Sequence, residues 1–182
     1  MDMMEKTLAK NQNIYSGMAE PIASRLIHVR KESIKESLGK FPNLAHRLEE
    51  VATIRGIQFI NDSKATNVNA TWYALESMHR PVIWIAGGQD NGNDYSILAS
   101  LARKKVKALV CLGANNSNLL NGFRKHVASI YTVSNINEAV NIAYFAGTPG
   151  DVVLLSPACA SFDLFKDYVD RGNRFKKAVY EL

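Results

Sequence analysis

The first residues that could do chemistry lie between Asp62 and Asn67, where an acid, a cation, two hydroxyls and an amide stand together. One interpretation is that a short polar side chain caps the first turn of a helix. The candidates for that cap are Asp62, Ser63, Thr66 and Asn67. Capping gives no reason for Lys64, because a cation beside a helix N-terminus opposes the helix dipole. An anion held between Lys64 and the helix would explain it, so the stretch predicts a cap or an anion-binding site.

Two further stretches are rich in small and polar residues. Residues 87–95 open with two glycines but match neither the dinucleotide fingerprint nor the phosphate loop, so they are read as a glycine-permitted turn. Residues 156–161 end at Ser161, which is expected to cap a following helix. The same helix N-terminus would lower the pKa of the Cys159 thiol, so a cysteine nucleophile is an alternative. No histidine follows Cys159 in the sequence to act as its base.

Apolar runs alternate with helical patterns through most of the chain. A continuous apolar run, typical of a strand buried on both faces of a parallel sheet, stands at 82–86, and further strands are expected at 108–112, 130–133 and 152–155. Helical patterns cover 70–78, 97–104, 118–126, 136–146 and 162–182. Two more β-prone runs, 49–54 and 57–61, are joined at Arg55-Gly56 and predict a tight hairpin. This alternation predicts an α/β fold with a mostly parallel sheet flanked by helices.

The parallel sheet places the three polar stretches. Ligands of open α/β sheets bind beyond the carboxyl ends of the strands, where each of these stretches begins. They are therefore expected to meet on one edge and to share one ligand. The terminal helix is expected to be interrupted near Gly172, and residues 171–173 are read as a surface kink.

Composition excludes several classes of protein. The chain has 182 residues, 47% of them hydrophobic, which suits one compact α/β domain with a short appendage. The net charge of +5 is dispersed, and the short basic runs at 103–105 and 176–177 are read as solvated helix faces, so no nucleic-acid partner is expected. The only cysteines, Cys111 and Cys159, form no CxxC pair, and Cys111 is expected to be a buried thiol. With no signal peptide or long apolar span, a cytoplasmic location without membrane attachment is expected.

The first forty residues differ from the rest. Apolar residues at Ile22, Leu26 and Val29 follow a helical spacing, with Pro21 at the first turn. We therefore divide the chain into an N-terminal helical linker, residues 1–40, and an α/β domain, residues 41–182.

Four strings together resemble the C-terminal domain of the Mur ligases, and among these the D-glutamate-adding ligases. The strings are DSKATN at 62–67, GG at 87–88, LLSPACAS at 154–161 and RGN at 171–173. The resemblance runs from about His46 to the end and extends more weakly back to Asn13. It implies a Rossmann-like third domain of a three-domain enzyme, with residues 1–40 as the remnant of the central domain's last helix. The phosphate loop and the magnesium ligands would belong to the missing N-terminal and central domains, so the chain alone is expected to be inactive.

The resemblance also implies an ATP-dependent reaction of peptidoglycan synthesis. ATP would phosphorylate the carboxylate of UDP-N-acetylmuramoyl-L-alanine, and the amine of D-glutamate would attack the acyl phosphate. Lys64 and Thr66 would lie near the amino acid's carboxylates and the reacting phosphate, with Lys64 as the catalytic residue. The other roles fall to Ser161, the Phe162 backbone and Tyr168 at the side-chain carboxylate, to Arg47 and Asp62 at the ATP, and to Asn13 at adenine. A dicarboxylate needs charge-assisted donors at both ends, which agrees with this set.

The chain departs from the family pattern at several positions. Asn91 stands where the family usually has a lysine that contacts a glutamate carboxylate, so D-glutamate binding depends on whether another cation compensates. Residues 10–12 are Lys-Asn-Gln in place of the usual Gly-Lys-His, and Ser16 replaces an asparagine, which affects the adenine contact. Asn91 favours a second hypothesis, a stand-alone binding or regulatory α/β module that has lost catalysis. The third is an unrelated hydrolytic enzyme that uses Cys159.

Overall fold

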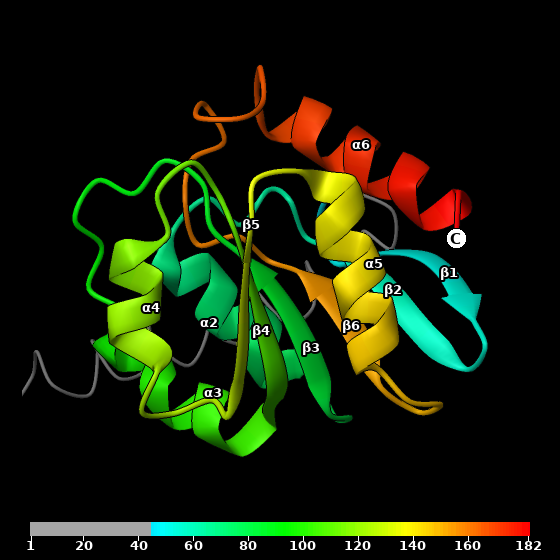
Figure 1. Ribbon diagram of the computed structural model, residues 1–182, viewed down its shortest axis with the longest axis horizontal. Coiled ribbons are helices and arrows are strands. Elements are labelled where there is room, and N and C mark those ends of the chain that lie inside the picture. The colour runs from blue at the N-terminus through cyan, green and yellow to red at the C-terminus, as the bar shows by residue number, and fades with distance from the viewer. Residues whose placement is uncertain (1–44) are drawn as a thin grey trace, which may run out of the picture. The chain divides into compact units, whose positions relative to one another are not determined.

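The computed structural model describes residues 45–182, and the expected linker helix, its boundary and Asn13 lie outside the described residues. One sheet of six strands runs through this part of the chain in the order β1-β2-β6-β3-β4-β5 (Figure 1). The strands are β1 (Glu49–Ile54), β2 (Ile57–Asn61), β3 (Val82–Ala86), β4 (Val106–Leu112), β5 (Ser129–Val133) and β6 (Val152–Leu155). The helices are α2 (Val68–Ser77), η1 (Ser96–Leu98), α3 (Ala99–Lys105), α4 (Ser117–Phe123), α5 (Ile136–Ala146) and α6 (Tyr168–Tyr180).

Pairing within the sheet confirms the predicted α/β fold. Strands β2, β6, β3, β4 and β5 pair in parallel, and only β1 is antiparallel, to β2. The β1–β2 hairpin turns at Arg55 and Gly56, both with positive φ (48° and 79°), which is the backbone that a two-residue hairpin turn requires. The predicted bounds of β3 and β6 match those of the structure.

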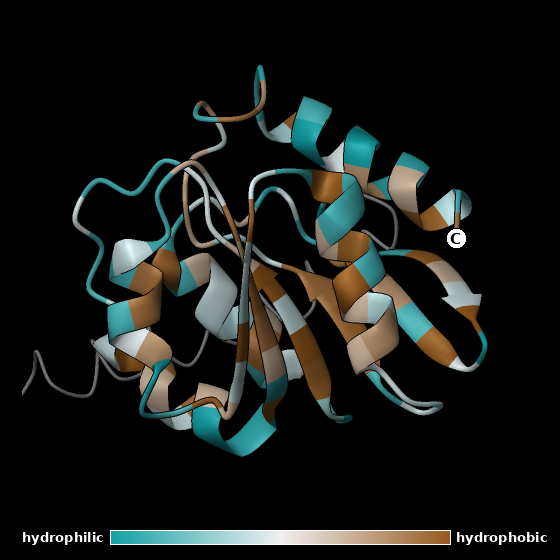
Figure 2. Cartoon of the chain, in the orientation of Figure 1, coloured by the Kyte–Doolittle hydropathy of each residue, from teal (hydrophilic) through white to brown (hydrophobic). Residues whose placement is uncertain are grey.

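Helices cover both faces of the sheet and leave its central strands β3 and β6 fully buried, whereas the edge strands β1 and β5 are partly exposed. Apolar side chains of α2, α3 and α4 join one core cluster, and those of α5 and α6 join the other. Strand β3 feeds both clusters, because Trp84 faces the first and its neighbours Ile83 and Ile85 face the second. The strands are accordingly apolar along most of their length in Figure 2. Two-sided burial explains why these strands read as continuous apolar runs.

Two helix predictions are corrected by the structure. The pattern at 97–104 is split into the 3₁₀ turn η1 and α3. The terminal helix begins at Tyr168 rather than near 162, because the Asp167 side chain accepts from the amide of Asp170 and caps it there. It then continues through Gly172 without interruption. Within residues 45–182 no helix has both the length and the apolar character needed to span a membrane.

Candidate functional site

The three polar stretches meet at the carboxyl edge of neighbouring strands, as predicted. We call them the first loop (62–67, after β2), the second loop (87–95, after β3) and the third loop (156–161, after β6). The first and third loops are joined by a hydrogen bond of 3.0 Å from the amide of Ala158 to the carbonyl of Ala65. The second and third are joined by bonds from Gly87 to Pro157 (2.8 Å) and from Gln89 to Ala160 (2.9 Å).

Arg171 of α6 donates hydrogen bonds to all three loops. Its Nε donates to the Ser63 hydroxyl at 3.0 Å, and its Nη2 donates to the carbonyls of Ser63 (3.0 Å) and Cys159 (3.2 Å). Its Nη1 reaches the carbonyls of Gly87, Cys159 and Ala160 at 3.2–3.4 Å. The side chain is only 1% exposed. Residues 171–173 were read as a surface kink, and this is wrong for Arg171.

The glycine pair of the second loop lets these backbones approach. Gly88 has φ of 136°, and a Cβ on it would lie 2.1 Å from the carbonyl oxygen of Ala160 and 3.1 Å from Nη1 of Arg171. Gly87 has φ of 125°, and its Cβ would lie 2.3 Å from the carbonyl oxygen of Leu112. Both positions therefore require glycine, for conformation and for space.

Lys64, Thr66 and Tyr168 lie close together around the first loop. Lys64 is exposed, its amide is held by the carbonyl of His46 at 2.9 Å, and its Nζ lies 6.0 Å from the centre of the Tyr168 ring. The Thr66 amide donates to the carbonyl of Lys64 at 2.9 Å. Of the proposed caps, it is Asn67 that caps α2, by accepting from the amide of Ala70 at 2.9 Å. Lys64 thus lies at the surface, and its ammonium forms no hydrogen bond or ion pair with another of the described residues.

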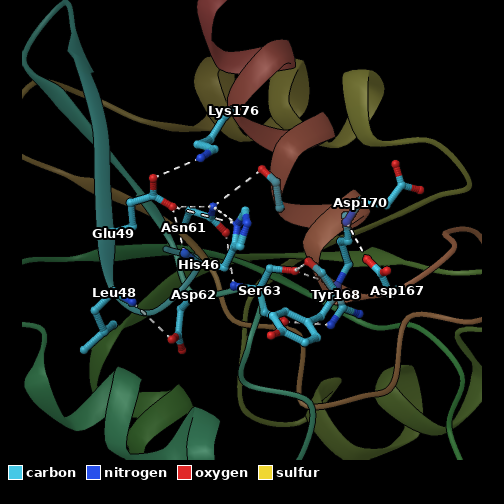
Figure 3. A network of polar contacts seen from close by, with 12 residues as sticks. His46, Leu48, Glu49, Asn61, Asp62, Ser63, Asp167, Tyr168, Asp170 and Lys176 are labelled. Carbon is cyan, nitrogen blue, oxygen red and sulfur yellow. Dashed lines mark hydrogen bonds and ion pairs between the residues drawn. The ribbon is translucent and has the colours of Figure 1, made fainter. Parts of the chain in front are cut away.

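A buried network ties the start of the described chain to α6 (Figure 3). The Nδ2 of Asn61 contacts Nδ1 of His46 at 2.9 Å and donates to Glu49 at 3.0 Å, and its Oδ1 accepts from the amide of Ser63 at 3.1 Å. Glu49 is in turn paired with Lys176 of α6 at 3.0 Å. The Ser63 hydroxyl donates to the carbonyl of Tyr168 at 2.8 Å. This network fixes the backbone of Lys64 relative to Tyr168.

Gly172 completes the network because the ring of His46 packs directly on it. A Cβ at Gly172 would lie 2.2 Å from Nδ1 of His46. Alanine usually stabilises an exposed helix relative to glycine by about 1 kcal/mol. We expect the opposite sign here: Gly172→Ala should lower the free energy of unfolding by about 2 kcal/mol or more in urea denaturation, because the core is overpacked. Asn173→Ala, at an exposed neighbour, is the matched control, and a stabilised Gly172→Ala would show that His46 does not occupy this position.

Asp62 is buried beneath the first loop, with 4% of its surface exposed. Its Oδ2 accepts from the Ser156 hydroxyl at 2.9 Å and its Oδ1 from the amide of Leu48 at 3.2 Å. Arg47, expected with Asp62 at the ATP, is the exposed residue next to Leu48. Their assignment to ATP stays a prediction.

Burial raises the pKa of Asp62 to about 7, and its hydrogen bonds with Ser156 and Leu48 only partly oppose this effect. The folded protein therefore holds this proton at pH values where the unfolded chain has lost it. The stabilising contribution is complete below pH 4 and is lost as the pH rises through about 7. We expect the free energy of unfolding of the unmodified chain to fall by roughly 2–4 kcal/mol between pH 4 and 8, relative to Asp62→Asn. Parallel pH profiles of the two proteins in urea denaturation would contradict a raised pKa.

The third loop differs from its prediction at two residues. Ser161 is buried and caps no helix, because its carbonyl accepts from Phe165 in a separate turn and α6 begins seven residues later. Cys159 is 1% exposed, and its sulfur lies 3.1 Å from the Tyr95 hydroxyl. Burial raises the pKa of this thiol rather than lowering it, so the cysteine nucleophile is ruled against on physical grounds. Phe162 is 68% exposed beside Ser161.

Asn91 belongs to a rigid turn in the second loop. The Asp90 carboxylate accepts from the amides of Gly92 and Asn93, both at 2.9 Å, and from the Tyr95 hydroxyl at 2.7 Å. A fourth bond from Asn118 of α4 anchors the same carboxylate at 2.8 Å. Asn91 is exposed within this turn. Its position is therefore set by Asp90, while its own side chain is open to solvent.

Reasoning from residue types missed the roles of Arg171, Asn61 and His46 in the site. Ser63 was considered only as a helix cap, but its hydroxyl instead accepts from Arg171 and donates to the carbonyl of Tyr168. The signal for Arg171 was its spacing, because Arg171, Phe175 and Ala178 follow the buried stripe of α6 at i, i+4 and i+7. An arginine on an apolar stripe indicates a buried cation with a structural or functional partner. Among residues 45–182, no group of three or more histidine, cysteine, aspartate or glutamate side chains is arranged to hold a metal ion.

Comparisons with known proteins agree with this geometry. The family model "Mur ligase, glutamate ligase domain" matches residues 46–159. UDP-N-acetylmuramoylalanine–D-glutamate ligases from Christiangramia forsetii and Porphyromonas gingivalis are 48% and 47% identical over all of this chain, and the chain spans about 41% and 40% of their lengths.

Solved structures share the fold at low sequence identity. The UDP-N-acetylmuramate–alanine ligase of Thermotoga maritima has a TM-score of 0.53 at 15% identity, over 80% of this chain and 32% of that one. A bifunctional folylpolyglutamate and dihydrofolate synthase of Yersinia pestis, complexed with AMPPNP and a manganese ion, has a TM-score of 0.50 at 18% identity, over 77% of this chain and 32% of that one. Three strand-end loops that meet on one edge, and a matching family model over more than half of the sequence, lead to one conclusion: this chain belongs to the Mur ligase family, in its glutamate ligase domain.

Proposed function

We propose that this chain is the C-terminal part of a cytoplasmic ATP-dependent ligase of peptidoglycan synthesis that joins D-glutamate to UDP-N-acetylmuramoyl-L-alanine. The observation that carries the proposal is the exposed Lys64, which lies beside the Tyr168 ring and directly precedes Ala65, where the first loop is bonded to the third. The likeness to D-glutamate ligases over the whole chain supports the choice of amino acid. Both cysteines are free thiols, which agrees with a reducing compartment.

The proposed reaction forms an amide bond in two steps. The γ-phosphoryl group of ATP passes to a carboxylate oxygen of UDP-N-acetylmuramoyl-L-alanine, which gives an acyl phosphate and ADP. The amine of D-glutamate then adds to the acyl carbon, loses a proton, and expels inorganic phosphate. Both steps place several negative charges near one another, so a nearby cation such as Lys64 would lower the free energy of the arrangement.

The role of this chain in the reaction would be to position D-glutamate. Lys64 and Thr66 would bind one carboxylate and face the reacting phosphate, while Ser161, the Phe162 backbone and Tyr168 would hold the other carboxylate. Arg47 and Asp62 would lie toward the ATP. Holding the amine close to the acyl carbon makes the second step effectively intramolecular. The described residues form no set of magnesium ligands, so no step through magnesium is assigned to them.

A chimera tests the proposal. Residues 1–182 replace the matching segment of the Christiangramia forsetii ligase, to which they are 48% identical, and the chimera is assayed for product by mass spectrometry. We expect D-glutamate-dependent formation of the UDP-linked dipeptide and release of phosphate, whereas the 182-residue chain alone should fold and turn over no ATP. A folded chimera that gives no product with D-glutamate, while the intact relative does, would refute the proposal and favour a binding or regulatory module.

A further inference from the structure

Arg171 carries a buried charge that forms no ion pair with a carboxylate among the described residues. The carboxylate of Asp163 is near enough to raise the pKa of Arg171, but its hydrogen bonds are accepted from the amides of Ala114 and Leu164. All of the hydrogen-bond acceptors of Arg171 are neutral: the hydroxyl of Ser63 and the carbonyls of Ser63, Gly87, Cys159 and Ala160. Within residues 45–182 no aspartate or glutamate forms an ion pair with it. Burial lowers its pKa only to about 10, so the guanidinium is charged at neutral pH. Buried charges in folded proteins are normally paired, whereas Asp163 favours the charge of Arg171 without forming an ion pair with it.

Neutral hydrogen bonds alone do not require a charged group. A buried cation is costly without an opposite charge, and a neutral side chain could also have donated to the loop carbonyls. The charge sits directly behind the edge where the first, second and third loops meet, while Lys64 stands exposed in the first loop. In a poorly solvated interior a charge acts over longer distances than in water. An anion on the outer side of the loops would therefore feel both cations.

We propose that the carboxylate or phosphate that binds at this edge balances the charge of Arg171, which Asp163 leaves without an ion pair, so that Arg171 is a positioning residue whose buried charge raises the affinity of the site for anions without touching them. The inference rests on the proposed function only in requiring an anionic ligand at the three loops. Arg171 would thus have two roles. The N–H donors of its guanidinium hold the three loops together, and its positive charge attracts an anion to them. Gly88 is required for this arrangement, because any side chain at position 88 would displace the guanidinium of Arg171 or the third loop.

Charge and packing can be separated by two substitutions. Arg171→Lys keeps the positive charge but loses the planar fork of donors, whereas Arg171→Gln keeps two donors and loses the charge. Both should lower the melting temperature. Arg174→Gln removes an exposed arginine one turn along α6, whose described partner is Asp170, and serves as the control for net charge.

The test is a nuclear magnetic resonance titration of the ¹⁵N-labelled 182-residue chain with inorganic phosphate and, separately, with D-glutamate. We expect the amides of Lys64 and Ser161 to shift with one midpoint for at least one of these anions. Arg171→Gln should weaken that binding by about tenfold or more, Arg171→Lys by less than about threefold, and Arg174→Gln not at all. Binding of phosphate alone points to the nucleotide as the source of the anion, and binding of D-glutamate alone points to the amino acid.

Three results would overturn the inference: equal weakening by Arg171→Lys and Arg171→Gln, full binding by Arg171→Gln, or no binding of either anion by the unmodified chain. If Arg171→Gln fails to fold, the Nε–H resonance of Arg171 in the unmodified chain decides. The Nε–H group donates a hydrogen bond to the Ser63 hydroxyl, and its resonance should shift with the same midpoint as that of the Lys64 amide. A resonance that stays in place at saturation contradicts the proposal. A chimera that fails to ligate D-glutamate leaves this anion-binding result unaffected, so the two proposals fail separately.

Discussion

Replacing Lys64 by alanine in the chimera should reduce kcat/KM for D-glutamate by about 100-fold or more while the free energy of unfolding changes by less than about 0.5 kcal/mol. The side chain is exposed and its ammonium lies 6.0 Å from the centre of the Tyr168 ring, so its loss should cost the fold little stability. The first loop is held instead through the backbone amide of Lys64, which alanine retains. Steady-state kinetics and urea denaturation of the same preparation measure both quantities.

Lys104→Ala is the matched control for Lys64, because Lys104 is an exposed lysine at the end of α3. It should leave both the rate and the stability unchanged. An unchanged rate for Lys64→Ala would remove Lys64 from the site. A stability loss as large as the rate loss would instead assign it a structural role.

Replacing Asn91 by lysine should lower the KM for D-glutamate by about tenfold with little change in kcat. The family resemblance implies that a lysine at this position would contact a glutamate carboxylate, and the hydrogen bonds of Asp90 hold the turn that contains position 91. A charge-assisted bond to a carboxylate contributes roughly 1.5–3 kcal/mol, which is consistent with a change of this size. The KM for D-glutamine, which lacks the second carboxylate, should change much less.

Asn121→Lys, on the exposed face of α4, adds the same charge elsewhere and should leave the KM unchanged. If it lowers the KM as much as Asn91→Lys does, the effect is one of net charge. If Asn91→Lys has no effect, position 91 does not face a carboxylate of the amino acid.

The sheet, and the edge at which the three loops meet, could be predicted because the hydrophobic pattern of the strands agrees with the fold that they form. Runs such as Val82–Ala86 and Val152–Leu155 are buried on both faces, so their boundaries follow directly from hydrophobicity. The parallel order then fixes where the loops after β2, β3 and β6 must meet. That is why the sequence alone predicts Lys64, Asn91 and Ser161 at one edge of the sheet.

The contacts that hold the edge together could not be predicted, because they depend on packing between distant segments. Gly172 looks like a helix breaker in the sequence, and only the ring of His46, 126 residues earlier, explains it inside α6. Arg171 looks like part of a surface kink in the sequence, whereas in the structure it is bonded to four loop carbonyls, those of Ser63, Gly87, Cys159 and Ala160. Cys159 was expected at a helix N-terminus, but α6 begins at Tyr168, and the thiol is buried against Tyr95.

The most direct test of the account is a crystal structure of the chimera with ADP and the UDP-linked dipeptide product bound. The account predicts density for the D-glutamyl residue at the carboxyl edge of β2, β6 and β3, in contact with residues of all three loops and with a carboxylate within ion-pair distance of Lys64 Nζ. A D-glutamyl residue that contacts only one loop, or that lies away from Lys64, would contradict it.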